Sequence, residues 1–342
     1  MTRPPIIQII TTIVLIVLIR PIKTQTIPAK EDLRHGMELC VQENYDQAFQ
    51  FFTDIRQRYP KDPAPHFFMA AILQTKMMDF ETLEWHNAFE LEIDTTLALS
   101  EAILKVDPEN IHARFYHGSA LSYISFQMAR EKKYLQSINR AITAMYQLHW
   151  VMENDSTCYD VYLGWGSYKY WRSYLTRHFN WLPFFRDQRQ EGIEYIITAY
   201  EYGSFSKWAA LSNLAWIYIQ EGQYREAIQC AKTGLSTFPD SRFFMWPWAD
   251  AHYGQGNYRA SLEAYKKLLQ SVRNEQYNNH YNEIVLHLKI ANCYFKLGDV
   301  NASQNHVQAL FAIHPEESVG KSLQPKFKEA EELLETIKSR IP

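Results

Sequence analysis

The stretch from Leu214 to Ala227, LAWIYIQEGQYREA, places small residues, aromatics and one glycine at helical intervals. Ala215 and Ala227 would let two antiparallel helices approach closely, with aromatic side chains filling the gaps beside them. Gly222 falls between the two helices, where a tight turn favours a residue without a Cβ atom. The stretch therefore predicts a pair of antiparallel helices joined by a short turn.

The same offsets recur along the chain with a period of about 34 residues, which is the period of stacked helix pairs. Small residues and glycines recur at three further places: Ala249 with Gly256, Ala291 with Gly298, and Gly36 with Ala48. Less regular pairs are predicted over 66–108, over 114–148, and over 160–202 around Gly164 and Ala199. The pattern predicts an all-α fold, an α-solenoid of about seven antiparallel helix pairs over 29–317. Insertions fall near 76–90, 171–190 and 273–283, and 318–342 is predicted to form a C-terminal capping helix.

These offsets resemble the tetratricopeptide repeat, in which a small residue on the first helix faces a small residue on the second. The resemblance implies a superhelix whose first helices line an inner groove that binds other polypeptides. The modules that grip the acidic C-terminal tails of heat-shock chaperones use lysines and asparagines at set inner positions. Only Asn292 matches such a position here, so the resemblance does not extend to that ligand.

Composition agrees with long helices and argues against nucleic acid as a partner. The chain has Trp 9, Tyr 22 and Phe 19 but only Gly 12 and Pro 14, which suits helices packed through large side chains. The formal net charge is −3, and no block of Lys and Arg offers an electrostatic footprint for nucleic acid.

The four cysteines, Cys40, Cys158, Cys230 and Cys293, lie far apart, without the spacing of a zinc site. We expect free and mostly buried thiols. A Cys230–Cys293 disulfide is the alternative if the body lies outside the cytoplasm.

Residues 1–26 have a basic start and an apolar run from Ile6 to Ile19. The length of this run matches a signal-peptide core and is short for a membrane span. The residues after Arg20 lack a clear cleavage site, so 1–26 is predicted to be a signal peptide or an uncleaved signal anchor. A buried N-terminal helix is the third alternative. We expect a protein exported to the periplasm or cell envelope, or anchored to the inner membrane through residues 6–19.

The largest insertion, from Trp171 to Gln190, holds an aromatic cluster that could contact a partner: Phe179, Trp181, Phe184 and Phe185. Three interpretations remain open for it. The segment packs on its own solenoid, contacts a partner or second copy, or enters a membrane interface.

His280, Glu283 and His287 share one predicted helix face and are capable of binding a metal. However, His280 and His287 would lie about 10 Å apart along the axis, too far to share one ion. We expect no metal, no cofactor and no catalytic residues, because no catalytic motif occurs. The chain is therefore predicted not to be an enzyme.

The predicted inner groove is aromatic with a few polar groups, which suits a peptide, an amphipathic helix or a glycan. The alternative is that about half of these rings pack inside the protein. Pro247 is predicted to delay or kink one inner helix. The candidate partner-binding residues are Phe115, Trp165, Tyr168, Lys169, Arg172, Trp216, Trp246, Asp250, Tyr253, Asn292 and Phe295.

Residues 29–317 also resemble a group of exported bacterial repeat proteins of undefined activity. The shared signatures are GWGSYKYWRS, WLPFFRDQR and NNHYNEI. The predicted function is a non-enzymatic scaffold that binds a protein or peptide in the bacterial cell envelope. The alternative is an accessory protein that handles a glycan polymer or a lipid. Homo-oligomerisation is left open.

Overall fold

The computed structural model describes residues 27–179 and 186–339, and over these residues the chain forms fifteen α-helices, one short 3₁₀ helix and no β-strand. The all-α prediction is confirmed for this part of the chain. In order the helices are α1 (Lys30–Val41), α2 (Tyr45–Arg58), α3 (Pro63–Asp79), α4 (His86–Val106), α5 (Ile111–Arg130), α6 (Tyr134–Asn154), α7 (Val161–Leu175), η1 (Arg177–Phe179), α8 (Arg189–Tyr202), α9 (Lys207–Gln220), α10 (Tyr224–Thr237), α11 (Arg242–Gly254), α12 (Tyr258–Arg273), α13 (Tyr281–Leu297), α14 (Val300–Phe311) and α15 (Glu317–Lys338).

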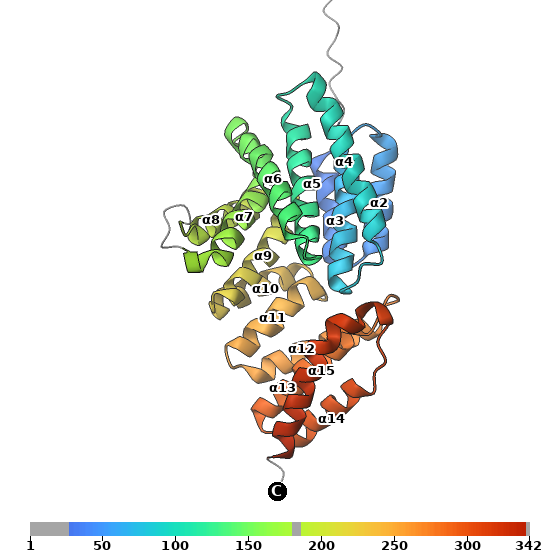
Figure 1. Cartoon of the computed structure of the whole chain (residues 1–342), viewed down its shortest axis with the longest axis vertical. Helices are drawn as coiled ribbons and strands as arrows, with labels where there is room; N and C mark the ends of the chain where they lie inside the picture. Colours follow the sequence, from blue (N-terminus) through green and yellow to red (C-terminus); the bar gives the residue numbers. More distant parts are fainter. Residues whose placement is uncertain (1–26, 180–185, 340–342) are drawn as a thin grey trace, which may run out of the picture.

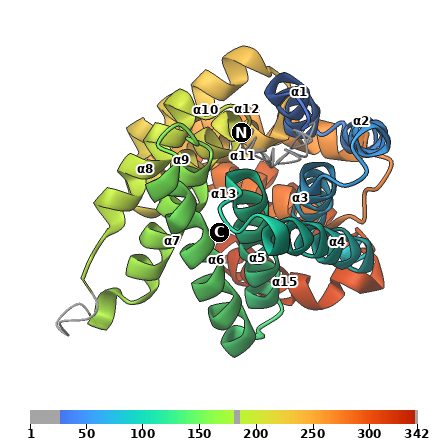
Figure 2. The ribbon, with the colours of Figure 1, turned by 90° about the horizontal axis from the view of Figure 1, so that it is seen from above.

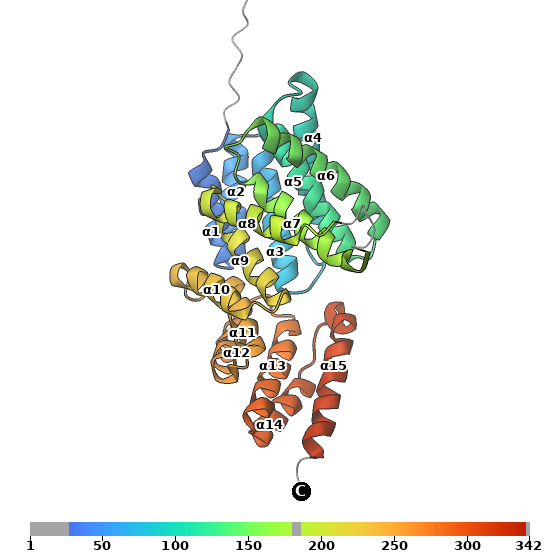
Figure 3. The same ribbon diagram turned by 90° about the vertical axis from the view of Figure 1, so that its left-hand side faces the viewer.

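From α1 to α14, each helix packs against the next one along the chain, and α15 packs on α13 and α14. The stack coils into a superhelix, with α1 to α8 at one end and α11 to α15 at the other (Figure 1). Figure 3 shows α15 running beside α13 at the C-terminal end. Seen from above, α1, α3, α5, α7 and α9 surround a common axis (Figure 2).

The pair α9 and α10 shows why the small residues are needed. Ala215 and Ala227 are both completely buried, at 0% exposure. Gly222 has φ of +72°, in the left-handed region that favours glycine, and Gly256 and Gly298 do the same in later turns. In earlier turns Glu43 and Lys132 hold positive φ angles without being glycine. The repeat is thus strictest in sequence in the C-terminal half, where the period is easiest to recognise.

Pro247 does not delay its helix. α11 begins at Arg242 and runs through the proline. Proline has no N–H, so the helix lacks one backbone hydrogen bond at this position. Packing on either side of the proline stabilises the helix, since Phe244 and Ala249 are both 0% exposed.

The turn after α1 contacts the start of α11. The Ser241 hydroxyl donates to the Val41 carbonyl at 2.6 Å, and the Phe243 amide donates to Glu43 at 2.9 Å. Val41 also shares an apolar core with Phe238, Phe244 and Leu211. The first helix pair therefore packs against helices that lie about 200 positions later in the sequence.

The segments near 76–90 and 273–283 contribute to the same closure by contacting each other. The Asn279 side chain donates to the Phe80 carbonyl at 2.7 Å. The Lys76 ammonium lies 3.7 Å from the centre of the Tyr277 ring and 4.4 Å from that of Trp85, a close cation–π arrangement. We use the name closure for three sets of contacts: those of Val41 and Glu43 with the start of α11, those between the segments near 76–90 and 273–283, and the ion pairs of Arg242 with Asp79 and Glu275.

Among the helices that the structure describes, none is long and apolar enough to span a bilayer. The predicted signal or anchor segment, residues 1–26, lies outside the described residues. The four cysteines are free thiols; Cys40 and Cys293 are buried, and Cys158 and Cys230 are half-buried.

Candidate functional site: a cavity on the superhelix axis

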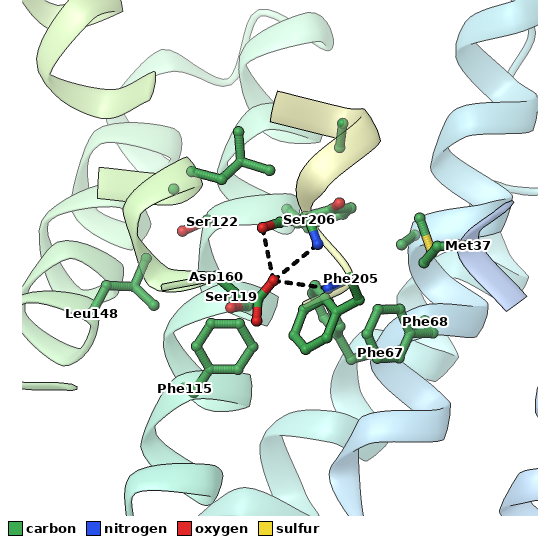
Figure 4. A pocket seen from close by; sticks show the side chains of 15 residues that line it. Met37, Phe67, Phe68, Phe115, Ser119, Ser122, Leu148, Asp160, Phe205 and Ser206 are labelled. Atoms are coloured by element: carbon green, nitrogen blue, oxygen red, sulfur yellow. Dashed lines mark hydrogen bonds between the residues drawn. The ribbon is translucent and has the colours of Figure 1, made fainter. Parts of the chain in front are cut away.

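A cavity of about 90 Å³ lies on the axis where the first helices of five consecutive pairs converge. Figure 4 shows aromatic rings on one side of it and small hydroxyl-bearing residues on the other. The lining residues are Met37 from α1, Phe67, Phe68 and Ala71 from α3, Phe115, Ser119, Ser122 and Tyr123 from α5, Leu148 from α6, Asp160, Leu163 and Gly164 at the start of α7, and Phe205, Ser206 and Ala209 at the start of α9.

Aromatic side chains build the apolar wall. Phe205 precedes α9, and its ring packs edge-on against Phe68 and Phe115, with centroids 5.1 and 5.8 Å apart. Phe67 extends the wall, packing against Phe68 at 5.3 Å. Ala71, Gly164 and Ala209 are too small to fill the space that these rings enclose. The cavity therefore exists because large and small residues alternate around the axis.

Asp160 is the single carboxylate in the lining, and its hydrogen bonds are internal. Its Oδ1 atom accepts from the amides of Phe205 and Ser206 at 3.0 and 2.9 Å, and from the Ser206 hydroxyl at 2.7 Å. The side chain is buried, so three bonds to one oxygen fix the turn before α9. Asp160 therefore positions the Phe205 ring.

Two hydroxyl groups in the lining, those of Ser119 and Tyr123, have no hydrogen-bond partner among the residues that the structure describes. The Ser119 side chain is only 8% exposed, and its hydroxyl makes no hydrogen bond to any residue that the structure describes. The neighbouring Ser122 hydroxyl instead donates to the Gly118 carbonyl at 3.0 Å. The cavity thus offers a ligand an apolar wall and hydroxyl groups that make no internal hydrogen bond.

Of the candidate groove residues, Phe115 lines this cavity and those on α7 do not. The Trp165 ring packs against His149 of α6, with centroids 4.9 Å apart. The Lys169 ammonium pairs with Glu191 of α8 and lies 5.3 Å from the Trp165 ring centre. Trp165 and Lys169 therefore hold α7 against its neighbours.

Tyr168 and Arg172 lie one turn apart on α7 and contact each other. The Arg172 guanidinium is 6.0 Å from the centre of the Tyr168 ring. Both side chains are half-buried, and neither lines the cavity.

The candidate groove residues further along the chain also make internal contacts. Asp250 accepts a hydrogen bond from Tyr265 at 2.5 Å and one from the Lys289 ammonium at 2.9 Å. Trp246 and Tyr253 pack against the core formed by α11, α12 and α13. Trp246 also reaches the core formed by α13, α14 and α15, where Phe295 packs.

Two candidates remain outside these cores. The Asn292 amide donates to the Leu288 carbonyl of its own helix at 3.1 Å. Trp216, at 39% exposure, is the most exposed aromatic among the candidates whose side chains the structure describes. Trp181, Phe184 and Phe185 lie outside the described residues, as does the side chain of Phe179, the last residue of η1.

Residues 208–241, which form most of α9 and α10 and the turns beside them, match the family model described as Tetratricopeptide repeat. The chain thus contains a tetratricopeptide repeat at this position. The match coincides with the pair in which Ala215, Gly222 and Ala227 create the close approach and the turn. No curated protein matches the chain.

Solved structures similar to this chain include tetratricopeptide-repeat proteins. PilW, a widely conserved type IV pilus biogenesis factor, is 16% identical with a TM-score of 0.48, covering 78% of this chain and 98% of its own. A tetratricopeptide repeat protein from Parabacteroides merdae is 15% identical with a TM-score of 0.42, covering 80% and 93%. The human IFIT1 dimer with m7Gppp-AAAA is 12% identical with a TM-score of 0.45, covering 93% and 83%. Such distant likeness gives no ligand for this chain.

The three metal-capable residues, His280, Glu283 and His287, form ordinary polar contacts. Glu283 accepts from Arg273 at 2.7 Å and contacts His280 at 3.1 Å. His287 instead faces His306 of α14, with their Nδ1 atoms 3.1 Å apart. Within the described residues, no three His, Cys, Asp or Glu side chains are grouped so as to hold a metal ion. The Asn279 side chain, one residue before the N-cap His280, accepts from the Tyr281 amide at 3.1 Å.

His287 should make the protein less stable in acid. Its Nε2 atom accepts from Arg273 at 3.0 Å, so the ring is neutral and its Nδ1–H donates to His306. Burial, followed by the charges of His306 and Arg273, lowers the pKa of His287 from 6.5 to about 4. The unfolded chain therefore binds an additional proton between these pH values, and stability falls as the pH falls from 6.5 to 4, by on the order of 3 kcal/mol.

Urea unfolding of the wild type and of His287→Gln between pH 7 and 4.5 checks this expectation. Glutamine keeps a polar side chain but does not titrate, so the variant should lose less stability over this range than the wild type. Other groups that titrate here, including Glu43, are common to both proteins and cancel in the comparison. Parallel stability curves for the two proteins would show that His287 contributes nothing to the pH dependence.

Proposed function

We propose that this protein is a non-enzymatic scaffold of the cell envelope that binds a partner polypeptide by accepting one apolar side chain into the axial cavity. The observation that carries the proposal is the cavity itself, enclosed by helices α1, α3, α5 and α7 and the start of α9. The ring of first helices supports it, because this inner face is where a superhelical array presents a continuous surface. The envelope location rests on the apolar run from Ile6 to Ile19.

The dimensions of the cavity favour a side chain over a glycan or a lipid. Pockets that enclose small-molecule ligands typically measure ~300–1,000 Å³, whereas this cavity measures about 90 Å³. The aromatic wall of Phe67, Phe68, Phe115 and Phe205 favours an apolar group and leaves few polar partners for a sugar. The Ser119 hydroxyl is placed to bond a backbone amide or carbonyl of the entering segment.

Crosslinking from inside the cavity tests the proposal. A small aliphatic diazirine side chain is placed at Ser119 of the full chain. On irradiation in cells it should form a covalent adduct with the partner. Because the partner is a polypeptide, protease digestion should remove the adduct. The same group at Ala102, exposed on the outer helix α4, is the matched control and should yield no such adduct. Replacing Ala209 with leucine fills the cavity and should reduce the Ser119 adduct at least several-fold, because the apolar group no longer fits.

Each contrary outcome is specific. A Ser119 adduct that resists protease would support the glycan or lipid alternative over a polypeptide. Equal adducts from Ser119 and Ala102 would show that the cavity confers no selectivity. Circular dichroism of each variant checks that the helices remain folded.

A further inference from the structure

Helix α6 carries an apolar stripe that no part of the described chain covers. Leu135 is 82% exposed, Ile138 55%, Ile142 58% and Tyr146 67%. Their spacing of three or four residues places all four on one face of the helix. The opposite face is already used, since Ser137, Ala144, Leu148 and Val151 are buried. α6 is therefore apolar on two sides, although only one of them contacts its own solenoid.

The exposed stripe has the dimensions of a helix–helix seam. It runs from Leu135 to Tyr146, about 16 Å along the axis, and its spacing matches the repeat with which paired helices interlock. Figure 2 shows α5 and α6 at one edge of the molecule, where a second helix can approach. Contiguous exposed apolar patches of this kind commonly mark protein interfaces.

Charges at the two ends of α6 favour an antiparallel partner with the same sequence. Lys132 is exposed before the helix begins, whereas Glu153 is exposed at its end, with 61% of its side chain accessible. If two copies of α6 pair antiparallel, Lys132 of each lies beside Glu153 of the other. An anionic lipid surface would repel the Glu153 carboxylate and a chain whose net charge is −3. These charges therefore favour a second copy over a lipid surface.

We propose that two copies of this chain associate through α6, with the two helices antiparallel and a two-fold axis near Ile142. Under a two-fold axis the same apolar stripe forms the interface on both partners, so each chain needs only one such face to dimerise. The seam is short, and the expected dimer is reversible and dependent on protein concentration. The association is independent of the axial cavity, because Leu135, Ile138, Ile142 and Tyr146 are not among the cavity lining.

Cysteine crosslinking in the full chain tests the geometry. A residue on the two-fold axis meets its own copy, so Ile142→Cys should give a disulfide-linked dimer under mild oxidation. Leu135 lies seven positions away, which separates its two copies by about 21 Å, and Leu135→Cys should give no more dimer than wild type. Val106→Cys is the control for exposure alone, because Val106 is 88% exposed on another helix. The wild type controls for the half-buried Cys158 and Cys230.

A charged variant measures the association without a crosslink. The wild type, purified as the full chain in detergent, should approach twice the chain mass of 40.4 kDa by light scattering as its concentration rises. Ile142→Lys should remain at one chain mass, because it places two ammonium groups in the seam. Since Ile142 is exposed, this variant should fold normally.

Three results would overturn the proposal. Ile142→Cys could crosslink no more than Val106→Cys, or Ile142→Lys could leave the mass unchanged. Alternatively, the wild type could stay at one chain mass while Ile142→Lys reduces cosedimentation with vesicles of phosphatidylglycerol and phosphatidylcholine. In that case the stripe contacts lipid and not a second copy.

Discussion

Arg242→Met is expected to lower the free energy of unfolding by about 3–5 kcal/mol, because it removes one partner from a buried charge cluster. Arg242 is only 3% exposed at the closure. Its guanidinium donates to Asp79 at 2.7 Å, to Ser271 at 3.1 Å, and to Glu275. Burial raises the pKa of Glu43 to about 7 even though the charge of Arg242 lowers it. Without the arginine, the nearby carboxylates would be left without their cation.

Urea or thermal unfolding measures this loss, and Arg189→Met is the matched control. Arg189 also binds two carboxylates, Asp187 and Glu221, but its side chain is 31% exposed. Solvent screens such a pair, so the control should cost no more than about 1 kcal/mol. Neutralising Asp79 in an Arg242→Met/Asp79→Asn double variant should recover part of the loss. Equal costs for the two arginines would show that the closure adds no stability.

Gly166→Ala is expected to destabilise the protein by about 3 kcal/mol, at the upper end of the cost of overpacking. A Cβ atom at Gly166 would lie 2.6 Å from the Gly192 carbonyl oxygen and 2.8 Å from an Ile196 side-chain carbon. The reciprocal contact, from Gly192 to the Gly166 oxygen, is 2.7 Å. Because one obstacle is backbone, relieving the clash requires α7 and α8 to separate.

Gly320→Ala is the control for Gly166→Ala, since both glycines lie within helices. A Cβ atom at Gly320 meets nothing within 4 Å, so this change should stabilise the protein by up to about 1 kcal/mol through helix propensity. Thermal unfolding should therefore shift in opposite directions for the two variants. A shift in the same direction would mean that α7 and α8 move apart at little cost.

The repeat could be predicted from the sequence because its determinants are local. Ala215, Gly222 and Ala227 lie within one helix pair, so their spacing alone specifies a close approach and a left-handed turn. The irregular pair over 160–202 was harder to interpret. Sequence spacing pointed to Gly164, whereas the backbones of α7 and α8 meet at Gly166 and Gly192. Gly164 and Gly166 both fit a helical period. Only the position of Gly192 on α8 shows that Gly166 is the point of close approach.

The closure and the cavity could not be predicted, because their determinants are distant in sequence. Arg242 and Asp79 are 163 residues apart, and no periodicity connects them. Phe205, which closes the cavity, lies in the turn between α8 and α9. A repeat pattern that considers only helix positions does not include this residue. Most of the aromatic residues predicted to face a groove have alternative partners nearby, as Trp165 has in His149. An aromatic residue at an inner position indicates burial as readily as binding.

Because of the closure, residues that are synthesised early can complete their packing only after residues that are synthesised late. The first helix pair leaves the ribosome early, but Val41 and Glu43 await Ser241 and Phe243, about 200 residues later. At ~5–20 residues per second, that delay is roughly 10–40 seconds. During this interval Val41 at the end of α1 lacks its partners Phe238 and Phe244, whereas an open array would already have completed each contact between neighbouring pairs. A nascent chain of this protein therefore carries an incomplete core until most of its length has been made.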